Sequence, residues 1–267
     1  MELKRLYFLV IGIAISMVNF SCEDIIDIPL KDSEAALIIE GTVSNTSTSQ
    51  VVRISKSVSI SDGNEFNGVS GALVKITDNT KKETILKELV NNPGVYVTTS
   101  LQGKPSATYS LNVVLDGKEY KATSKMPAEV RLDSLGISVS SFGSEISQSV
   151  EAYYNDPIGT KNYYRFILFL NNDRLKDIYT FNDDFNDGKT VTVELGSSDL
   201  KILGSDTVGV QMLCIDQNVH RYFEGLDQNE NRGGASTTPA NPISNISNGA
   251  LGYFSAHTVS RGIVRLR

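Results

Sequence analysis

Residues 109–124 read YSLNVVLDGKEYKATS, and this stretch decides the fold class. Tyr109–Leu115 is predicted to form one strand and Glu119–Ser124 the next. Asp116-Gly117 between them is a dipeptide typical of the tight turn that joins two antiparallel strands. The stretch therefore predicts a β-hairpin.

Five further short strands, separated by turns, precede this hairpin. Together with its two strands they make seven, and seven short strands of this kind are typical of an all-β sandwich. Met126-Pro127 ends the block, because proline cannot pair within a central strand. Residues 34–127 are therefore predicted to form one sandwich domain. The further strands expected are Ala36–Val43, Val51–Ser57, Ala72–Thr77, Glu83–Leu89 and Val95–Val97, with turns at Asp78-Asn79 and Asn91–Gly94.

Four segments of this block follow one another in a recognisable order: Gly71–Val74, Pro93–Tyr96, Tyr109–Val113 and Tyr120–Ala122. Their order resembles the transthyretin-like repeats that are fused to many bacterial surface proteins. The resemblance implies a transthyretin/Ig-like sandwich that acts as a spacer or docking module.

Residues 128–267 are predicted to form a second β-rich domain with one helix, at about residues 216–230. Asp216 is a good N-cap, and apolar residues follow at helical spacing, namely Val219, Tyr222, Phe223 and Leu226. Gly233-Gly234 is expected to end the helix. The predicted fold is thus all-β, with two sandwich domains and one short helix. The strands expected here are Leu135–Val139, Val150–Tyr154, Tyr163–Asn171, Lys176–Thr180, Thr190–Leu195, Val208–Ile215, Leu251–Phe254 and Thr258–Leu266.

The N-terminus has the organisation of an exported lipoprotein. Lys4 and Arg5 precede the apolar run Leu6–Phe20, which is shorter than the roughly 20 residues that span a bilayer. Ser21-Cys22 then resembles the lipobox of bacterial lipoproteins, although Asn19 stands where leucine is usual. We expect residues 1–21 to be a signal peptide and residues 22–33 a tether lipidated at Cys22. The alternatives are a plain signal peptide or an anchor helix.

The other cysteine supports this interpretation. Cys214 alternates with Val208, Val210 and Met212 on one face of an expected strand, so we predict a buried, unpaired thiol. Acyl chains on Cys22 would then hold the protein on a membrane. The net charge of −6 disfavours a nucleic-acid partner, and it provides no attraction to anionic lipid.

Three stretches, Ser21–Ile28, Asp156–Phe166 and Asn241–Phe254, together resemble an uncharacterised lipoprotein family of the Bacteroidota, domain-of-unknown-function family 4249. The resemblance covers nearly the whole chain. Members are often encoded beside TonB-dependent outer-membrane receptors, which implies an accessory role in uptake. The family supplies no catalytic residue. Ser134 and Thr207 lie in Asp-Ser/Thr-apolar triplets that resemble the O-glycosylation sites of this phylum.

The sequence predicts no catalytic site and no cofactor. A nucleophile needs a neighbouring base, usually histidine, and the chain has only His220 and His257. We expect His220 to have a surface or helix-face role and His257 to lie at the start of a strand. Zinc-ligand spacings and a glycine-rich phosphate loop are absent from the sequence.

The sharpest acidic cluster is Asn182–Gly188. Counting back from Gly188 as in an EF-type calcium loop places Phe185 between Asp183 and Asp187, and phenylalanine cannot bind calcium. A solvated hairpin loop is therefore the preferred interpretation, and no metal is expected.

Other polar and aromatic residues are dispersed. Glycoside hydrolysis needs two carboxylates across a cleft, and sequence spacing does not show that any pair of Glu151, Asp156, Glu194 and Asp216 converges. The chain has no tryptophan for stacking on sugars. Tyr153-Tyr154 and Tyr163-Tyr164 are the best aromatic pairs, and one ring of each is expected in the core because neighbouring strand residues face opposite sides.

The tail loop is the preferred patch for a partner or ligand, through Asn245, Asn248, Tyr253 and Phe254. The alternative is that this loop caps the second sandwich. The function expected is a lipid-anchored binding module that assists a TonB-dependent receptor in nutrient uptake, on the periplasmic or cell-surface side of the outer membrane. A structural or adhesive surface lipoprotein and a carboxylate-dependent hydrolase are the alternatives, and the oligomeric state is left open.

Overall fold

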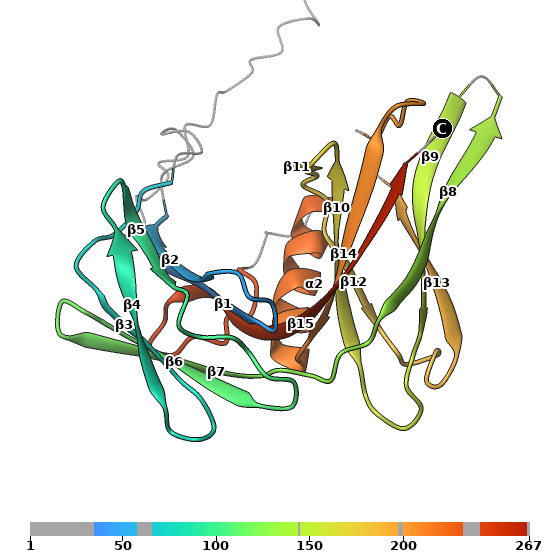
Figure 1. The fold of residues 1–267 in the computed structure, drawn as a ribbon. Coiled ribbons are helices and arrows are strands. Elements are labelled where there is room, and N and C mark those ends of the chain that lie inside the picture. The colour runs from blue at the N-terminus through green and yellow to red at the C-terminus, as the bar shows by residue number, and fades with distance from the viewer. Residues whose placement is uncertain (1–34, 58–65, 144, 197–199, 232–240, 266–267) are drawn as a thin grey trace, which may run out of the picture. The chain divides into compact units, whose positions relative to one another are not determined.

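The computed structural model describes residues 35–57, 66–143, 145–196, 200–231 and 241–265 (Figure 1). The predicted signal peptide, the tether with Cys22 and the expected helix stop at Gly233-Gly234 lie outside these residues. Within them, no helix has both the length and the apolar character needed to cross a membrane. They belong to one compact unit that begins at Ala35.

The prediction of an all-β fold with one short helix is confirmed, and the two sheets are consistent with sandwich architecture. The turn predicted at Asn91–Gly94 lies earlier, at Val90-Asn91, and Asn92–Gly94 belongs to the strand that follows. Pro93 is tolerated there since the pairing of its strand with the neighbouring β2 begins only at Val95. The first seven strands are β1 (Leu37–Ser44), β2 (Gln50–Lys56), β3 (Leu73–Thr77), β4 (Glu83–Leu89), β5 (Asn92–Thr98), β6 (Thr108–Leu115) and β7 (Lys118–Lys125).

The β6–β7 hairpin forms as its turn dipeptide predicts. Asp116 and Gly117 have φ angles of 49° and 74°, and Leu115 pairs with Lys118 across a two-residue loop. Two consecutive positive φ angles match the right-handed twist of the strands, and aspartate followed by glycine tolerates them well. The turn chemistry therefore fixes the register of this pair.

The second half contains seven more strands before the last one, together with the helix. Of the predicted strand Lys176–Thr180, only Tyr179 and Thr180 lie in a strand. Two short strands pair with the same edge of β10, and residues 175–178 only connect them. The elements are β8 (Leu132–Phe142), β9 (Glu145–Asn155), β10 (Tyr163–Leu170), β11 (Asp173–Arg174), β12 (Tyr179–Asn182), β13 (Thr190–Gly196), β14 (Thr207–Ile215) and α2 (Gln217–Asn231).

The two predicted closing strands form a single strand, β15 (Leu251–Arg265). Residues 251–257 pair in parallel with β1, and residues 258–265 pair antiparallel with β14. Figure 1 shows β15 running from beside β1 to beside β14. At the changeover, the Val259 N–H donates to Asn45 Oδ1 at 2.9 Å. The two predicted strands merge because both halves of β15 find hydrogen-bond partners.

The β15 strand joins β1–β7 to β10, β11, β12 and β14 in one large sheet, while β8, β9 and β13 form a second sheet. One hydrophobic core lies among β1–β7. Another lies between the second sheet and the part of the first sheet that contains β10 and β14. The C-terminal tail supplies four residues to the first core, so the chain returns to that core after building the second. The division into domains at residues 127/128 stays a prediction. The four tail residues are Ile246, Ala250, Phe254 and Ala256.

Helix α2 covers the opposite face of β10, β14 and β15 from the second core. Asp216 caps it as predicted, since its Oδ1 accepts the Val219 N–H at 3.0 Å. The predicted apolar stripe faces the sheet, where Val219 and Phe223 are buried against Leu213. The same face of the sheet continues past α2, and that extension leads to the candidate site.

Candidate functional site

The tail loop is held by hydrogen bonds within the tail and by hydrogen bonds to β7. The Asn245 side chain exchanges two hydrogen bonds of 2.8 Å with the Phe254 backbone. Ser247 pairs with Lys121 of β7, donating its N–H to the Lys121 carbonyl and accepting the Lys121 N–H on its Oγ, both at 2.8 Å. The described part of the loop therefore covers the edge of β7 and contributes to the first core, and the alternative that the loop caps the second sandwich stays a prediction.

The four residues of the predicted patch have different environments. Phe254 is 0% exposed in the first core, whereas Tyr253 is half-buried on the other face of β15 and packs against Tyr222 and Phe223 of α2. Asn248 is exposed and its amide reaches the Glu119 carbonyl at 3.4 Å. Asn248 is thus the member of the patch most accessible to a partner, and the patch stays a prediction.

Gly252 allows the tail to approach β1. Its φ is +97°, and a Cβ at this position would lie 2.1 Å from the Ile39 carbonyl oxygen. A side chain would clash there and would also disfavour the left-handed backbone. The parallel pairing of β15 with β1 therefore depends on glycine at this position.

The two candidate glycosylation residues lie on different strands. Ser134 is exposed at an irregularity in the β8–β9 pairing. Thr207 is half-buried at the start of β14, and its N–H donates to Asn171 Oδ1 at 3.0 Å. Ser134 is therefore the more accessible hydroxyl.

Both histidines are buried. His220 is 5% exposed on the side of α2 that contacts the Tyr163 ring, so of the two roles expected for it the helix-face role is the one observed. His257 lies inside β15 and not at a strand start, 3.0 Å from Ser255 Oγ and 7% exposed. Burial lowers the pKa of both histidines, that of His257 to about 4 with the charge of Arg165 acting in the same direction. Cys214 has a free, buried thiol on the strand face predicted for it.

Arg165 is a buried charge that the sequence reasoning missed. It is 8% exposed, its guanidinium lies 3.6 Å from the centre of the Phe223 ring, and its Nε has no hydrogen-bond partner. Burial lowers its pKa to about 10. The available signal was a charged residue between two buried aromatics, Tyr164 and Phe166. Arg165 packs α2 onto the sheet through a cation–π contact.

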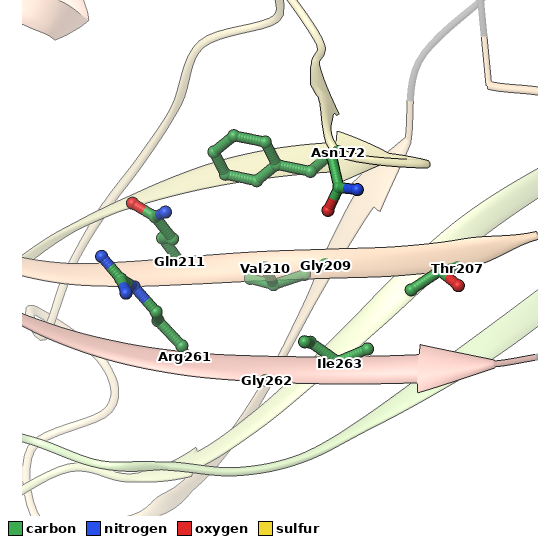
Figure 2. A pocket seen from close by; sticks show the side chains of 9 residues that line it. Asn172, Thr207, Gly209, Val210, Gln211, Arg261, Gly262 and Ile263 are labelled. Atoms are coloured by element: carbon green, nitrogen blue, oxygen red, sulfur yellow. The ribbon is translucent and has the colours of Figure 1, made fainter.

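An open groove lies on the face of the sheet that carries α2, over β10, β14 and β15. Its cavity measures about 220 Å³. Figure 2 shows Gln211 and Arg261 side by side at one end, and the β14–β15 register places them directly opposite each other. Phe169 and the 71%-exposed Ile263 contribute apolar surface, so polar groups flank an apolar floor. Within the described part of the chain, Arg261 forms no ion pair.

The structure brings some of the scattered carboxylates together. Glu151 pairs with Glu194 across β9 and β13 on the solvent face. Asp216 caps α2 and also accepts a hydrogen bond from the Ser124 hydroxyl. Asp156 meets two aspartates of the Asn182–Gly188 cluster, and together they form the one group of acidic residues, among those described, with the spacing to hold a metal ion.

The tyrosine pairs divide between the two faces as predicted. Tyr154 and Tyr164 are buried in the second core with ring centres 4.8 Å apart. Tyr153 faces the solvent side, where its hydroxyl donates to Glu151 at 2.5 Å, whereas Tyr163 is partly covered by α2.

Comparison with known proteins gives one family. The profile of a family described as Domain of unknown function (DUF4249) matches residues 23–263. No curated protein matches the chain.

Proposed function

The chain belongs to the family described as Domain of unknown function (DUF4249), and on that premise we propose that it is a lipid-anchored binding module of the bacterial cell envelope. It assists a TonB-dependent outer-membrane receptor in nutrient uptake. The observation that carries this proposal is the order of the N-terminal residues, with Lys4-Arg5, the apolar run Leu6–Phe20 and then Ser21-Cys22. The matched family segment begins at the next residue, residue 23.

A lipid anchor is needed because the charge of the protein does not draw it to a membrane. The net charge is −6, and anionic lipid attracts clusters of Lys and Arg. A single acyl chain binds a membrane only weakly and reversibly, whereas several chains attach it stably. Diacylglyceryl and N-acyl groups on Cys22 would supply them.

Binding is favoured over catalysis by the described side chains. His220 and His257 are buried, and burial lowers the pKa of both, so neither is a base that a substrate can reach. The groove with Gln211, Arg261 and Ile263 offers apolar surface with a few polar groups, which is the usual composition of a recognition site. The groove is therefore the first surface to test for receptor contact.

Site-specific photo-crosslinking in cells tests this function. A photoreactive residue at Gln211 should crosslink the chain to a β-barrel receptor, whereas the same residue at Lys118, the first residue of β7, should not. Cys22→Ser should move the protein to the soluble fraction and abolish the crosslink. Crosslinking without regard to position, or a Cys22→Ser protein that stays in the membrane fraction, would contradict the proposal. Loss of cell attachment with unimpaired uptake would point to an adhesive lipoprotein instead.

A further inference from the structure

Three aspartates from two loops converge next to the second core. Asp156 directly follows β9, whereas Asp183 and Asp187 lie between β12 and β13. One carboxylate oxygen from each lies within 4.8 Å of the other two. Asp156 and Asp183 are only 5% and 3% exposed, and Asp187 is exposed. Two carboxylates are therefore held close together in a largely buried position, which is costly unless a cation compensates them.

A donor orients one oxygen of Asp183 and one of Asp187, whereas Asp156 accepts on both oxygens, with the Gly188 N–H 3.4 Å from its Oδ2. Hydrogen bonds of this kind orient carboxylates that bind a metal. The other donors come from the loop after β9 and from the start of β10. They are the Asn162 N–H on Asp183 Oδ2 (2.8 Å), the Gly159 N–H on Asp187 Oδ1 (2.7 Å) and the Tyr164 hydroxyl on Asp156 Oδ1.

The Oδ1 of Asp183 is a buried oxygen that accepts no hydrogen bond. Lys161 Nζ lies 2.8 Å away, but this contact lacks hydrogen-bonding geometry, and the same ammonium contacts Asp184. The Lys161 side chain is 47% exposed, so water screens its attraction for the carboxylates. Lys161 pairs with Asp183 and Asp184, and among the described residues Asp156 and Asp187 form no ion pair, so negative charge remains in excess around the two buried carboxylates.

We propose that Asp156, Asp183 and Asp187 bind a calcium ion. Carboxylate oxygens select hard cations, whereas zinc and copper sites usually include nitrogen or sulfur ligands. The three oxygens all lie within 4.8 Å of one another, so a single calcium ion at about 2.4 Å from each can reach them. Magnesium demands a stricter octahedron and usually keeps several waters, whereas calcium accepts a more flexible set of oxygens.

The third ligand explains why a linear motif does not reveal the site. Phe185 occupies the position where an EF-type loop needs an oxygen, and it is 86% exposed. Asp156, from another part of the chain, would supply the ligand oxygen that Phe185 lacks. The ion would tie the loop after β9 to the loop before β13, and its remaining ligands would be water and loop carbonyls. This inference does not depend on the proposed function.

Terbium luminescence tests the site on the full chain, purified in detergent and stripped with a chelator. Terbium substitutes for calcium, and with no tryptophan in the sequence its excitation must come from tyrosine, here Tyr164 beside Asp156. We expect a saturable terbium signal that calcium displaces. Calcium at about 100 times its Kd should also raise Tm by roughly 5–10 °C.

The variants separate a calcium site from an internal ion pair. Asp183→Asn and the exposed Asp187→Asn should each weaken terbium binding by more than about 10-fold. Asp173→Asn, an exposed residue of β11, should leave binding unchanged. Lys161→Met should bind at least as tightly as the unmodified chain, because the competing ammonium is gone. No terbium signal and no calcium-dependent change in Tm would overturn the proposal. So would equal binding by Asp187→Asn, which is informative even if Asp183→Asn does not fold.

Discussion

Replacing Phe254 by alanine should strongly destabilise the protein, because this side chain carries the C-terminal tail into the first core. The ring is 0% exposed and lies on Gly41, where an added Cβ would be only 2.9 Å from Phe254 Cδ2. Removing a buried phenylalanine ring usually costs about 3–5 kcal/mol. That is a large part of the roughly 5–15 kcal/mol that stabilises a typical domain. For a chain of this size, Tm should fall by about 6–20 °C.

The assay is equilibrium urea unfolding of the full chain, followed by circular dichroism, with Ile263→Ala as the matched control. Ile263 lies on the same strand but is 71% exposed, so its truncation should change the free energy of unfolding by about 0.5 kcal/mol or less. The reasoning fails if Phe254→Ala costs less than about 1 kcal/mol, or no more than the control. Either result would mean that the tail only lies on the surface.

Three further predictions concern single residues. Gly252→Ala should destabilise the protein by more than about 2 kcal/mol in the same assay, because of the clash with Ile39 and the left-handed backbone. The control Gly249→Ala should cost about 1 kcal/mol, because Gly249 also has a positive φ of +77° but has open space around it. Asp216→Ala should cost about 1–2 kcal/mol through the lost cap on Val219, visible as a lower Tm, and an unchanged Tm would contradict the capping role. His257 has a pKa lowered to about 4 when folded against about 6.5 when unfolded, so its contribution to stability is complete above about pH 6.5 and is lost as the pH falls towards 4. His257→Gln should therefore show a smaller loss of urea midpoint between pH 7 and 4.5 than the unmodified chain, and an equal loss would refute the assignment.

The sequence was sufficient where a few neighbouring residues determine the structure. Asp116-Gly117 dictates its turn because both residues tolerate positive φ, and Asp216 caps α2 because its carboxylate reaches an N–H three residues on. The alternation that places Cys214 in the second core is equally local. Such features need no knowledge of distant partners.

Features that depend on distant partners were not predictable in the same way. β15 is one strand because β1 and β14 bind successive halves of it, and Ser255–His257 alone gives no sign of this. The Asp156, Asp183 and Asp187 cluster combines two loops separated by β10, β11 and β12. The groove at Gln211 and Arg261 exists because two strands align them in register.

Mass spectrometry of the N-terminal peptide from protein isolated from its native membranes tests the lipid-anchored account most directly. The account predicts that the peptide begins at Cys22 and carries a diacylglyceryl group on its sulfur and an acyl chain on its amine. A peptide with an unmodified Cys22, or one that still contains residues 1–21, would contradict it.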